Sequence, residues 1–450
     1  MPLKAITTTY EKKIPKTVTE VYEPRPEDSS VEGEVINLYP EVSFQEIIGF
    51  GGAFTESFGY TMSCLGEEKQ QDILEAYFGD GGLGYTMCRL HLDSCDFSLS
   101  NYSAVTDPQD RELKTFSLDR DRKYIIPYLK KAQEISERKI QYLMSPWSPP
   151  AFMKSNGQKN QGGKLLPEYY PLWGKYMAKY VAAYREMGFD VTMLSVQNEA
   201  NATQRWDSCV YTGEEEMRFV RDSLGPALRE AGAGNTQILV WDHNKERVFE
   251  RARDVFSDEA AAGYAGGVAF HWYSGDHFEA VELVSRIWPD KKLILSEGAF
   301  EYIPEEGIDQ LDHAQTYAHQ MIGNFNAGMH ATIDWNLALN EEGGPNHVGN
   351  WAVAPIMCDT KENSFEKQLS YTYIGHFSRH VRPGAHRIGF SRYTQELETC
   401  AFRNTDGTIV AVILNRTLKE IPFQLRISGK LYENLVSPGS SIMTILLEPS

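Results

Sequence analysis

The sequence predicts an α/β protein: a (β/α)8 TIM barrel with a small β-sandwich domain built from both chain termini. Strand-like and helix-like stretches alternate from about residue 48 to residue 380, eight of each kind. The strand-like runs are apolar without alternation, as expected of parallel strands buried on both faces. The two tails carry no helical periodicity, which sets them apart from the barrel.

The predicted barrel occupies residues 46–380. Its strands are short apolar runs that end in polar or turn-forming residues, in chain order Ile48–Phe54, Tyr85–Leu92, Gln141–Trp147, Val191–Glu199, Gln237–His243, Gly267–Tyr273, Lys292–Glu297 and Ala331–Leu337. Helical patterns lie between and after them, at Glu67–Phe78, Arg120–Arg138, Glu168–Met187, Gly213–Ala231, Lys245–Phe256, Phe278–Trp288, Ile308–Ala327 and Ser364–His380.

The tails, residues 1–45 and 381–450, are predicted to build one β-sandwich side domain together. Residues 1–45 are rich in Thr, Val, Glu and Pro. The C-terminal tail contains four strand patterns joined by turns, at Thr399–Arg403, Thr408–Asn415, Phe423–Ile427 and Ser441–Glu448. The sequence Asn-Thr-Asp-Gly at 404–407 predicts a hairpin between the first two of them.

Composition narrows the function classes. The 450 residues carry a net charge of −18, which disfavours nucleic acid and anionic membrane surfaces as partners. No apolar run reaches the length of a membrane span, and the first residues lack an apolar stretch of signal-peptide length, so we expect a cytoplasmic protein. The six cysteines form no CxxC pair, which favours buried free thiols. Nothing in the sequence indicates the oligomeric state.

Two carboxylates are the main functional signal. Glu199 ends the fourth predicted strand and Glu297 ends the seventh, where each would face the mouth of the barrel. A pair of carboxylates is what glycoside hydrolysis requires, one as acid/base and one as nucleophile or base. Glu301 and the Glu305–Glu306 pair compete with Glu297, but they lie past the strand end in a predicted loop. Glu214–Glu216 open a helix, where they favour its dipole.

Other polar and aromatic residues stand at the ends of neighbouring strands, and a barrel would bring them to the same face. They are Arg89, Asp96, Trp147, His271, Trp272, Tyr273, Trp335 and Asn336. Arg89 beside a carboxylate nucleophile would keep it ionised, and Tyr273 could orient it. The charge on that nucleophile would raise the pKa of the neighbouring acid. Trp147, Trp272 and Trp335 suit the apolar faces of sugar rings, although each could equally pack in the core.

No cofactor or metal is predicted. The GxGxxG match at 79–84 follows a helix and precedes a strand, the reverse of a dinucleotide-binding turn, so we interpret it as a helix C-cap. His376 and His380 are four residues apart on a predicted helix, but no third ligand accompanies them.

Several motifs resemble glycoside hydrolase family 30, the family of lysosomal glucosylceramidase and its microbial relatives. They run through most of the chain, at 49–56 (GFGGAFTE), 94–97 (SCDF), 145–150 (SPWSPP), 197–199 (QNE), 271–273 (HWY), 296–297 (SE), 335–340 (WNLALN) and 343–345 (GGP). Two departures are Ala200, where the family often has Pro, and Gly298 after the nucleophile position. Any one of these motifs alone would be a weak indication, but together they are specific for the family.

The resemblance implies hydrolysis with retention through a covalent glycosyl-enzyme, with Glu199 as acid/base and Glu297 as nucleophile. It implies that Asn198 binds the sugar 2-hydroxyl. It also implies a −1 subsite lined by Asp96, Trp147, His271, Trp335, Asn336 and Asn350, with no metal or organic cofactor.

The substrate is expected to be a carbohydrate or glycoside, most simply a terminal β-D-glucoside cleaved by an exo-acting, glucosylceramidase-like β-glucosidase. A β-xylosidase or β-1,6-glucanase of the same family is the alternative. A catalytically silent carbohydrate-binding barrel is the alternative from a different class, and the presence of both Glu199 and Glu297 argues against it.

Overall fold

The predicted barrel is present in the computed structural model, which describes residues 2–27 and 30–449. Within those residues, eight parallel strands pair around a closed circuit in chain order, so each strand lies beside the next one along the chain. The strands are β5 (Gly49–Phe54), β6 (Met87–Leu92), β7 (Gln141–Pro146), β8 (Asp190–Ser195), β9 (Gln237–Asn244), β10 (Ala265–His271), β11 (Lys292–Glu297) and β13 (Ala331–Asn336).

Apolar side chains fill the inside of the barrel and make it a packed core rather than a channel. Seven of its strands contribute to one buried cluster: Met87, Leu143, Met193, Leu239, Ala269, Ile294, Ala331 and Ile333. This core supports the carboxyl ends of the strands from below. The polar side chains at those ends are thereby left to form a site above this core.

Helices surround the barrel. They are α1 (Glu56–Ser63), α2 (Glu67–Phe78), α3 (Asp119–Tyr124), α4 (Ile126–Ile135), α5 (Tyr170–Glu186), α6 (Gly213–Phe219), α7 (Gly225–Glu230), α8 (Val248–Phe256), α9 (Glu259–Ala262), α10 (Phe278–Ile287), α11 (Gln310–Asn326) and α12 (Leu369–Ser378). The single helix predicted at 120–138 is divided into α3 and α4, because Pro127 lacks the amide proton that a continuous helix would need. A π-helical turn at Val220–Leu224 likewise separates α6 from α7.

The helix predicted at 364–380 begins later than expected. Its first residues form β17 (Ser364–Lys367), which pairs antiparallel with β16 (Ile356–Asp359), and α12 follows. Asn363 adopts a φ of +50° in the connecting turn, and the Asp359 carboxylate accepts the amide protons of Lys361 and Glu362. This turn closes a hairpin that helical periodicity alone could not reveal. β14 (Ala338–Leu339) pairs with β16 on its other side.

Both tails form the side domain, a ten-stranded sheet within the described residues. The strands are β1 (Leu3–Glu11), β2 (Ile14–Tyr22), β3 (Arg25–Pro26), β4 (Val35–Glu46), β18 (His386–Arg392), β19 (Leu397–Arg403), β20 (Ile409–Asn415), β21 (Ile421–Ile427), β22 (Lys430–Ser437) and β23 (Ser441–Leu447). N-terminal β1 pairs with C-terminal β23, and β4 lies between β18 and β21. The predicted hairpin joins β19 to β20, whereas β18 and β22 were not predicted. The proposed domain boundaries stay predictions.

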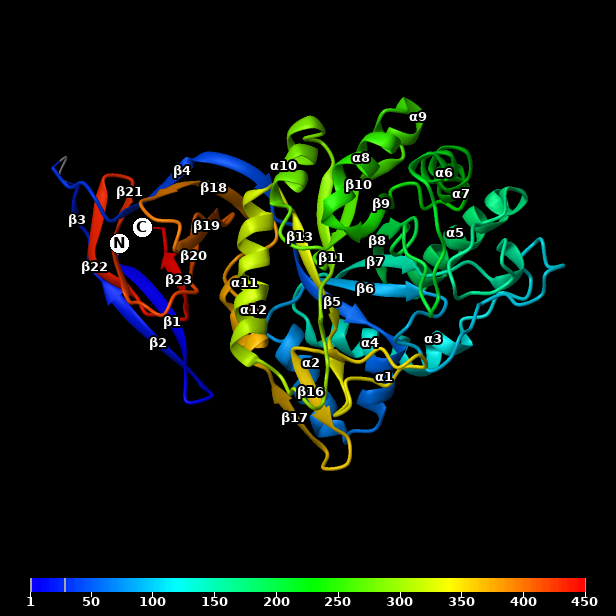
Figure 1. Ribbon diagram of the computed structural model, residues 1–450, viewed down its shortest axis with the longest axis horizontal. Coiled ribbons are helices and arrows are strands. Elements are labelled where there is room, and N and C mark those ends of the chain that lie inside the picture. The colour runs from blue at the N-terminus through cyan, green and yellow to red at the C-terminus, as the bar shows by residue number, and fades with distance from the viewer. Residues whose placement is uncertain (1, 28–29, 450) are drawn as a thin grey trace.

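Helices α11 and α12 lie between the side domain and the barrel, as Figure 1 shows, and both chain termini lie in the side domain. His376 of α12 is buried at this junction, where its ring nitrogens each lie 2.8 Å from a hydroxyl, of Thr8 and of Thr444. Burial lowers the pKa of His376 to about 3. The histidine is therefore a packed residue, as the sequence favoured over a metal ligand.

The six cysteines are unpaired, and all but Cys64 are buried, as expected for five of the six. None of the helices in the described part of the chain is both long and apolar enough to cross a membrane.

Candidate active site

A cleft of about 400 Å³ lies at the carboxyl ends of the barrel strands. Eight of the predicted site residues line it: Asp96, Trp147, Asn198, Glu199, Tyr273, Glu297, Trp335 and Asn350. Its remaining wall was not predicted and is formed by Phe97, Gln204, Trp206, His243, Asn244, Ala299, Phe300, Glu301, Trp351 and Ala352. Most of these follow a strand by several residues, in loops whose path the sequence pattern does not reveal.

Three predicted residues lie behind the cleft rather than on its surface. Arg89 and His271 have no exposed surface, and Asn336 is 2% exposed. Asn336 accepts a 2.5 Å hydrogen bond from Thr55, which turns its side chain toward α1. These residues can act on the cleft through the side chains in front of them. Asn336 is not among the residues that line the cleft, but its amide nitrogen has no hydrogen-bond partner among the described residues, so its role in the sugar site stays a prediction.

Glu297, the last residue of β11, is held at both carboxylate oxygens. Arg89 donates to Oε2 at 2.5 Å, and the Tyr273 hydroxyl donates to Oε1 at 2.9 Å. The strand is itself fixed by pairing with β10 on one side and β13 on the other. The carboxylate is therefore oriented by two donors, as expected from the sequence.

Glu199 follows β8 in a tight turn, where its φ is +49°. Its amide donates to the carbonyl of Asp242 at 2.7 Å, and the preceding Asn198 amide donates to Pro146 at 2.8 Å. Gln204 donates to Glu199 Oε2 at 3.3 Å. A left-handed residue outside glycine is uncommon and is kept only where its surroundings impose it. Here the turn directs the carboxylate into the cleft.

The two carboxylates face each other closely. One oxygen of Glu199, one oxygen of Glu297 and one ring nitrogen of His271 all lie within 4.8 Å of one another. Three such groups could in principle hold a metal ion. However, both oxygens of Glu297 already accept hydrogen bonds, and the Arg89 guanidinium opposes a second cation. The set is better suited to proton transfer and nucleophilic attack.

Asp242 organises the site from beneath, and the sequence analysis missed it. Its carboxylate is fully buried and accepts hydrogen bonds from Arg89 at 2.9 Å and from the serines that end or nearly end three strands, Ser145, Ser195 and Ser296. The sequence does contain the pattern that indicates a site residue, because Asp242 is an acidic residue directly after the apolar run 238–241 of β9. The predicted strand Gln237–His243 contains Asp242, so this residue did not stand out as one at a strand end.

The backbone at Asp242 is unusual as well. Trp241 and Asp242 have φ values of +73° and +47°, and the pairing of β9 with β10 shifts register at this point. The buried carboxylate of Glu216 accepts the Trp241 amide proton at 2.8 Å, which stabilises the irregular turn. Burial raises the pKa of Asp242, but Arg89 and His271 lower it far more, so this carboxylate stays charged.

One proton can lie on either His271 or Glu199, and the pKa shifts of the two groups favour His271. Burial lowers the pKa of His271, but the negative charges of Glu297, Asp242 and Glu199 raise it to about 9. Burial raises the pKa of Glu199, but the adjacent His271 lowers it below its usual value. His271 Nδ1 lies 3.6 Å from Glu199 Oε1. At neutral pH the proton therefore rests on His271, whereas the sequence analysis placed it on Glu199.

Asp96 presents a free acceptor in the wall of the cleft. Its Oδ2 accepts from Asn350 at 2.8 Å, while its buried Oδ1 has no hydrogen-bond partner among the described residues. Burial and the charge of Glu297 raise the pKa of Asp96 to about 8, despite the hydrogen bond from Asn350. A sugar hydroxyl would satisfy this unpartnered oxygen.

Two of the three tryptophans predicted at strand ends line the cleft. The rings of Trp147 and Trp335 stack with 5.2 Å between centroids, and the Arg89 guanidinium lies 4.7 Å from the Trp147 ring. Trp272 instead points away from the cleft and packs against Tyr317. Neighbouring residues of an extended chain point to opposite sides, so Trp272 points away from the side on which His271 and Tyr273 lie.

Comparison with known proteins agrees with this geometry. The family model "Glycosyl hydrolase family 30 TIM-barrel domain" matches residues 47–381, and "Glycosyl hydrolase family 30 beta sandwich domain" matches residues 384–445. Lysosomal acid glucosylceramidase of Mus musculus is 33% identical over 430 residues, 92% of this chain and 83% of the relative.

Two solved structures match the full length. SrfJ from Salmonella typhimurium has 39% identity and a TM-score of 0.93, with 100% of both chains covered. The endo-β1,6-glucanase BT3312 has 26% identity and a TM-score of 0.89, again with 100% of both chains covered. The resemblance carried by the sequence motifs is thereby confirmed.

Proposed function

The chain belongs to glycosyl hydrolase family 30 and is a glycoside hydrolase, and we propose that it is a retaining β-glucosidase that removes terminal β-D-glucosyl units. The observation that carries the proposal is the close approach of Glu199 and Glu297, with an oxygen of each within 4.8 Å of the other. Retaining glycosidases keep their carboxyl groups about 5–5.5 Å apart, whereas inverting enzymes need room for a water molecule between carboxylate and sugar.

Glu297 acts as the nucleophile in this proposal. Its carboxylate attacks the anomeric carbon while Arg89 and Tyr273 hold it in line, and a covalent glycosyl-enzyme forms. Glu199 donates a proton to the departing glycosidic oxygen. Because the shared proton rests on His271, the imidazolium supplies it to Glu199 as negative charge on Glu297 is consumed by ester formation.

The second step reverses these roles. Glu199, now ionised, removes a proton from water, which attacks the anomeric carbon and releases the sugar with its original configuration. Asn198 accepts a hydrogen bond from Arg89 at 2.8 Å, which orients its amide toward the sugar 2-hydroxyl. The unpartnered oxygen of Asp96 would accept from hydroxyls at the other end of the ring, which suits a terminal hexose.

A β-1,6-glucanase is the second candidate, and the outer part of the cleft favours it. Trp206, Trp351 and Glu301 line the cleft together with the two carboxylates and could hold a further sugar ring. The solved endo-β1,6-glucanase is also similar along its whole length. Exo and endo action would differ in whether the polysaccharide continues past the sugar unit bound at Asp96.

Proton NMR of the first product tests the stereochemistry. With an aryl β-glucoside we expect the β-anomer of glucose to appear before mutarotation adds the α-anomer. An initial α-anomer would mean inversion and would contradict the proposal. Aryl glucoside, xyloside, galactoside and fucoside, compared at equal concentration, then define the sugar.

A β-1,6-glucan and the β-1,6-linked disaccharide separate the two candidates. We expect release of glucose alone from either substrate. A ladder of oligosaccharides from the polymer would favour the glucanase.

A further inference from the structure

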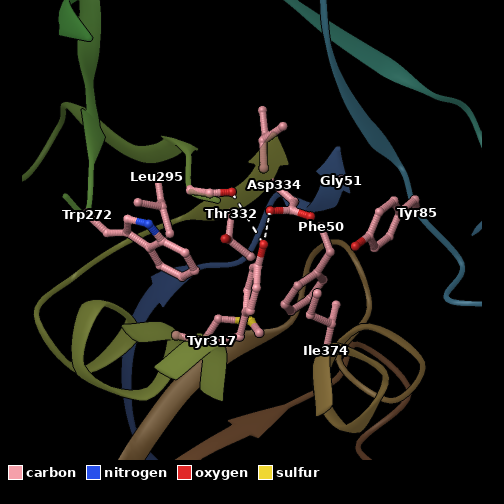
Figure 2. A pocket seen from close by; sticks show the side chains of 12 residues that line it. Phe50, Gly51, Tyr85, Trp272, Leu295, Tyr317, Thr332, Asp334 and Ile374 are labelled. Carbon is pink, nitrogen blue, oxygen red and sulfur yellow. Dashed lines mark hydrogen bonds between the residues drawn. The ribbon is translucent and has the colours of Figure 1, made fainter. Parts of the chain in front are cut away.

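A small cavity lies directly behind the nucleophile, on the outer side of the barrel wall, where α11 and α12 cover β11 and β13. Its volume of about 20 Å³ is enough for one water molecule. Asp334 and Tyr317 meet at its centre, as Figure 2 shows, with Tyr85 directed at Asp334 from the other side. A buried carboxylate in an otherwise apolar wall is costly unless it is used or partnered.

The Asp334 carboxylate and the Tyr317 hydroxyl form a short hydrogen bond. The hydroxyl lies 2.6 Å from Asp334 Oδ1, and it lies 3.4 Å from the carbonyl oxygen of Gly298. Gly298 directly follows Glu297. The same carbonyl also accepts the amide proton of Trp335 at 3.1 Å, so the carbonyl of the residue after the nucleophile is held from β13 and α11 together.

Gly298 is packed closely against the Trp272 ring. A side chain at position 298 would place its Cβ 2.7 Å from the Trp272 ring, so only glycine fits there. The Trp272 ring in turn packs edge-on against Tyr317, with 4.6 Å between ring centroids. The tyrosine therefore contacts the nucleophile segment both through its hydroxyl and through its ring.

We propose that Tyr317 and Asp334 are positioning residues for the nucleophile: through the Gly298 carbonyl they fix the end of β11 and hence the direction of the Glu297 carboxylate. This inference rests on the proposed role of Glu297. Nucleophilic attack tolerates little misplacement, and an error of about 1 Å can lower a rate about 100-fold. Arg89 and Tyr273 hold the carboxylate itself, while Tyr317 and Asp334 hold the backbone behind it.

The protonation of Asp334 decides which way the hydroxyl proton of Tyr317 points. Burial, with a smaller contribution from the charge of Glu297, raises the pKa of Asp334 to about 7, against the opposing hydrogen bond of Tyr317. A protonated Asp334 can donate to the Tyr317 oxygen, which frees the Tyr317 proton for Gly298. Asparagine in place of Asp334 would imitate this neutral donor.

The test compares Tyr317→Phe with Tyr85→Phe. Tyr85 is a matched control, because it is equally buried and lines the same cavity, but no hydrogen bond joins it to Gly298 in the described part of the chain. On an aryl β-glucoside with a poor leaving group, Tyr317→Phe should lower kcat about 10- to 100-fold and change KM less than about twofold. Tyr85→Phe should leave both within about twofold, and the Tm of each variant is measured alongside.

A second comparison uses two variants of Asp334, one that can still form hydrogen bonds and one that cannot. Asp334→Asn should keep at least half of the parent kcat, whereas Asp334→Leu, which cannot hydrogen-bond, should lose as much as Tyr317→Phe. Unchanged kcat in Tyr317→Phe, or equal losses of kcat in Tyr317→Phe and Tyr85→Phe, would overturn the inference. The proposed function would still stand in that case, provided that the parent enzyme is active on the aryl β-glucoside. A parent enzyme without turnover on any aryl glycoside would overturn both.

Discussion

Arg89 and Asp242 form an ion pair of 2.9 Å in which neither side chain has any exposed surface. Arg89 comes from β6 and Asp242 from β9, so the pair joins two sides of the barrel beneath the cleft. Arg89 also donates hydrogen bonds to Glu297 and Asn198, and the Asp242 carboxylate is hydrogen-bonded to the His271 ring. One buried ion pair therefore links the proposed nucleophile, the sugar-binding amide and the proton-sharing histidine.

Replacing Asp242 by Asn should damage both stability and catalysis. The variant leaves the Arg89 charge buried with one partner fewer, and breaking a buried pair costs about 3–5 kcal/mol. It also removes a charge that keeps His271 protonated, so we expect kcat/KM to fall about 100-fold. Thermal unfolding and steady-state kinetics measure the two effects.

The matched control is Asp406→Asn, which removes a 2.8 Å ion pair with Arg382 that is about half exposed. Exposed pairs contribute little, so its Tm and kcat/KM should equal those of the parent. If Asp242→Asn behaved like this control, the organising role of Asp242 would be wrong.

The acid/base role of Glu199 predicts a dependence on the leaving group. Glu199→Ala should lower kcat/KM about 100- to 10,000-fold for glucosides with poor leaving groups, and far less for activated ones that need no protonation. Added azide should restore turnover, because it needs no general base, and should yield β-glucosyl azide. Recovery of the α-azide instead would show that Glu199 and Glu297 have exchanged roles.

Glu297 rather than Glu301 is expected to carry the covalent intermediate. Glu297 ends a strand paired on both sides, whereas Glu301 is exposed on the two-residue strand β12 (Phe300–Glu301), which pairs with β15 (Ala352–Val353). A 2-deoxy-2-fluoro-β-glucoside with a good leaving group should form a long-lived ester, and peptide mapping should locate it on Glu297.

Substitution of the same two residues gives the kinetic counterpart. Glu297→Gln should lose nearly all activity, while Glu301→Gln, the matched control from the cleft wall, should keep most of it. An ester on Glu301, or an active Glu297→Gln enzyme, would refute the assignment.

The shared proton predicts the alkaline limb of the pH profile. Activity requires that the Glu199–His271 pair hold its proton, and the pKa of His271 is raised to about 9. Because this pKa is raised, the proton is present below about pH 9 and is lost as the pH rises through that value. We therefore expect kcat/KM to decline only as the pH approaches about 9.

His271→Gln should move this limb to lower pH by about one unit or more, because Glu199 must then hold the proton alone. His243→Gln is the control. His243 Nε2 lies 3.9 Å from Glu199 Oε1, but burial lowers the pKa of His243, so its imidazole is neutral in this range. An unshifted limb in His271→Gln would place the titrating proton elsewhere.

Local pattern predicted the parts of the site that lie at strand ends. Glu199, Glu297, Trp147 and Trp335 stand at or just past the ends of apolar runs, and a parallel barrel necessarily brings such positions to one face. The strand-end rule also placed Trp272 there, and this was wrong, because the rule does not say which side of the chain a residue points to.

The sequence by itself determined that the chain forms a parallel barrel, that its tails form β-structure, and that two strand-end glutamates face one cleft. Periodicity and residue type suffice for these, since both act over a few neighbouring residues. Only the tertiary structure decided that Asp242 underlies the site, that His271 lies between Asp242 and Glu199, and that Asp334 pairs with Tyr317. Those relationships depend on distances between strands far apart in the chain and on the burial that sets each charge, which no local pattern records.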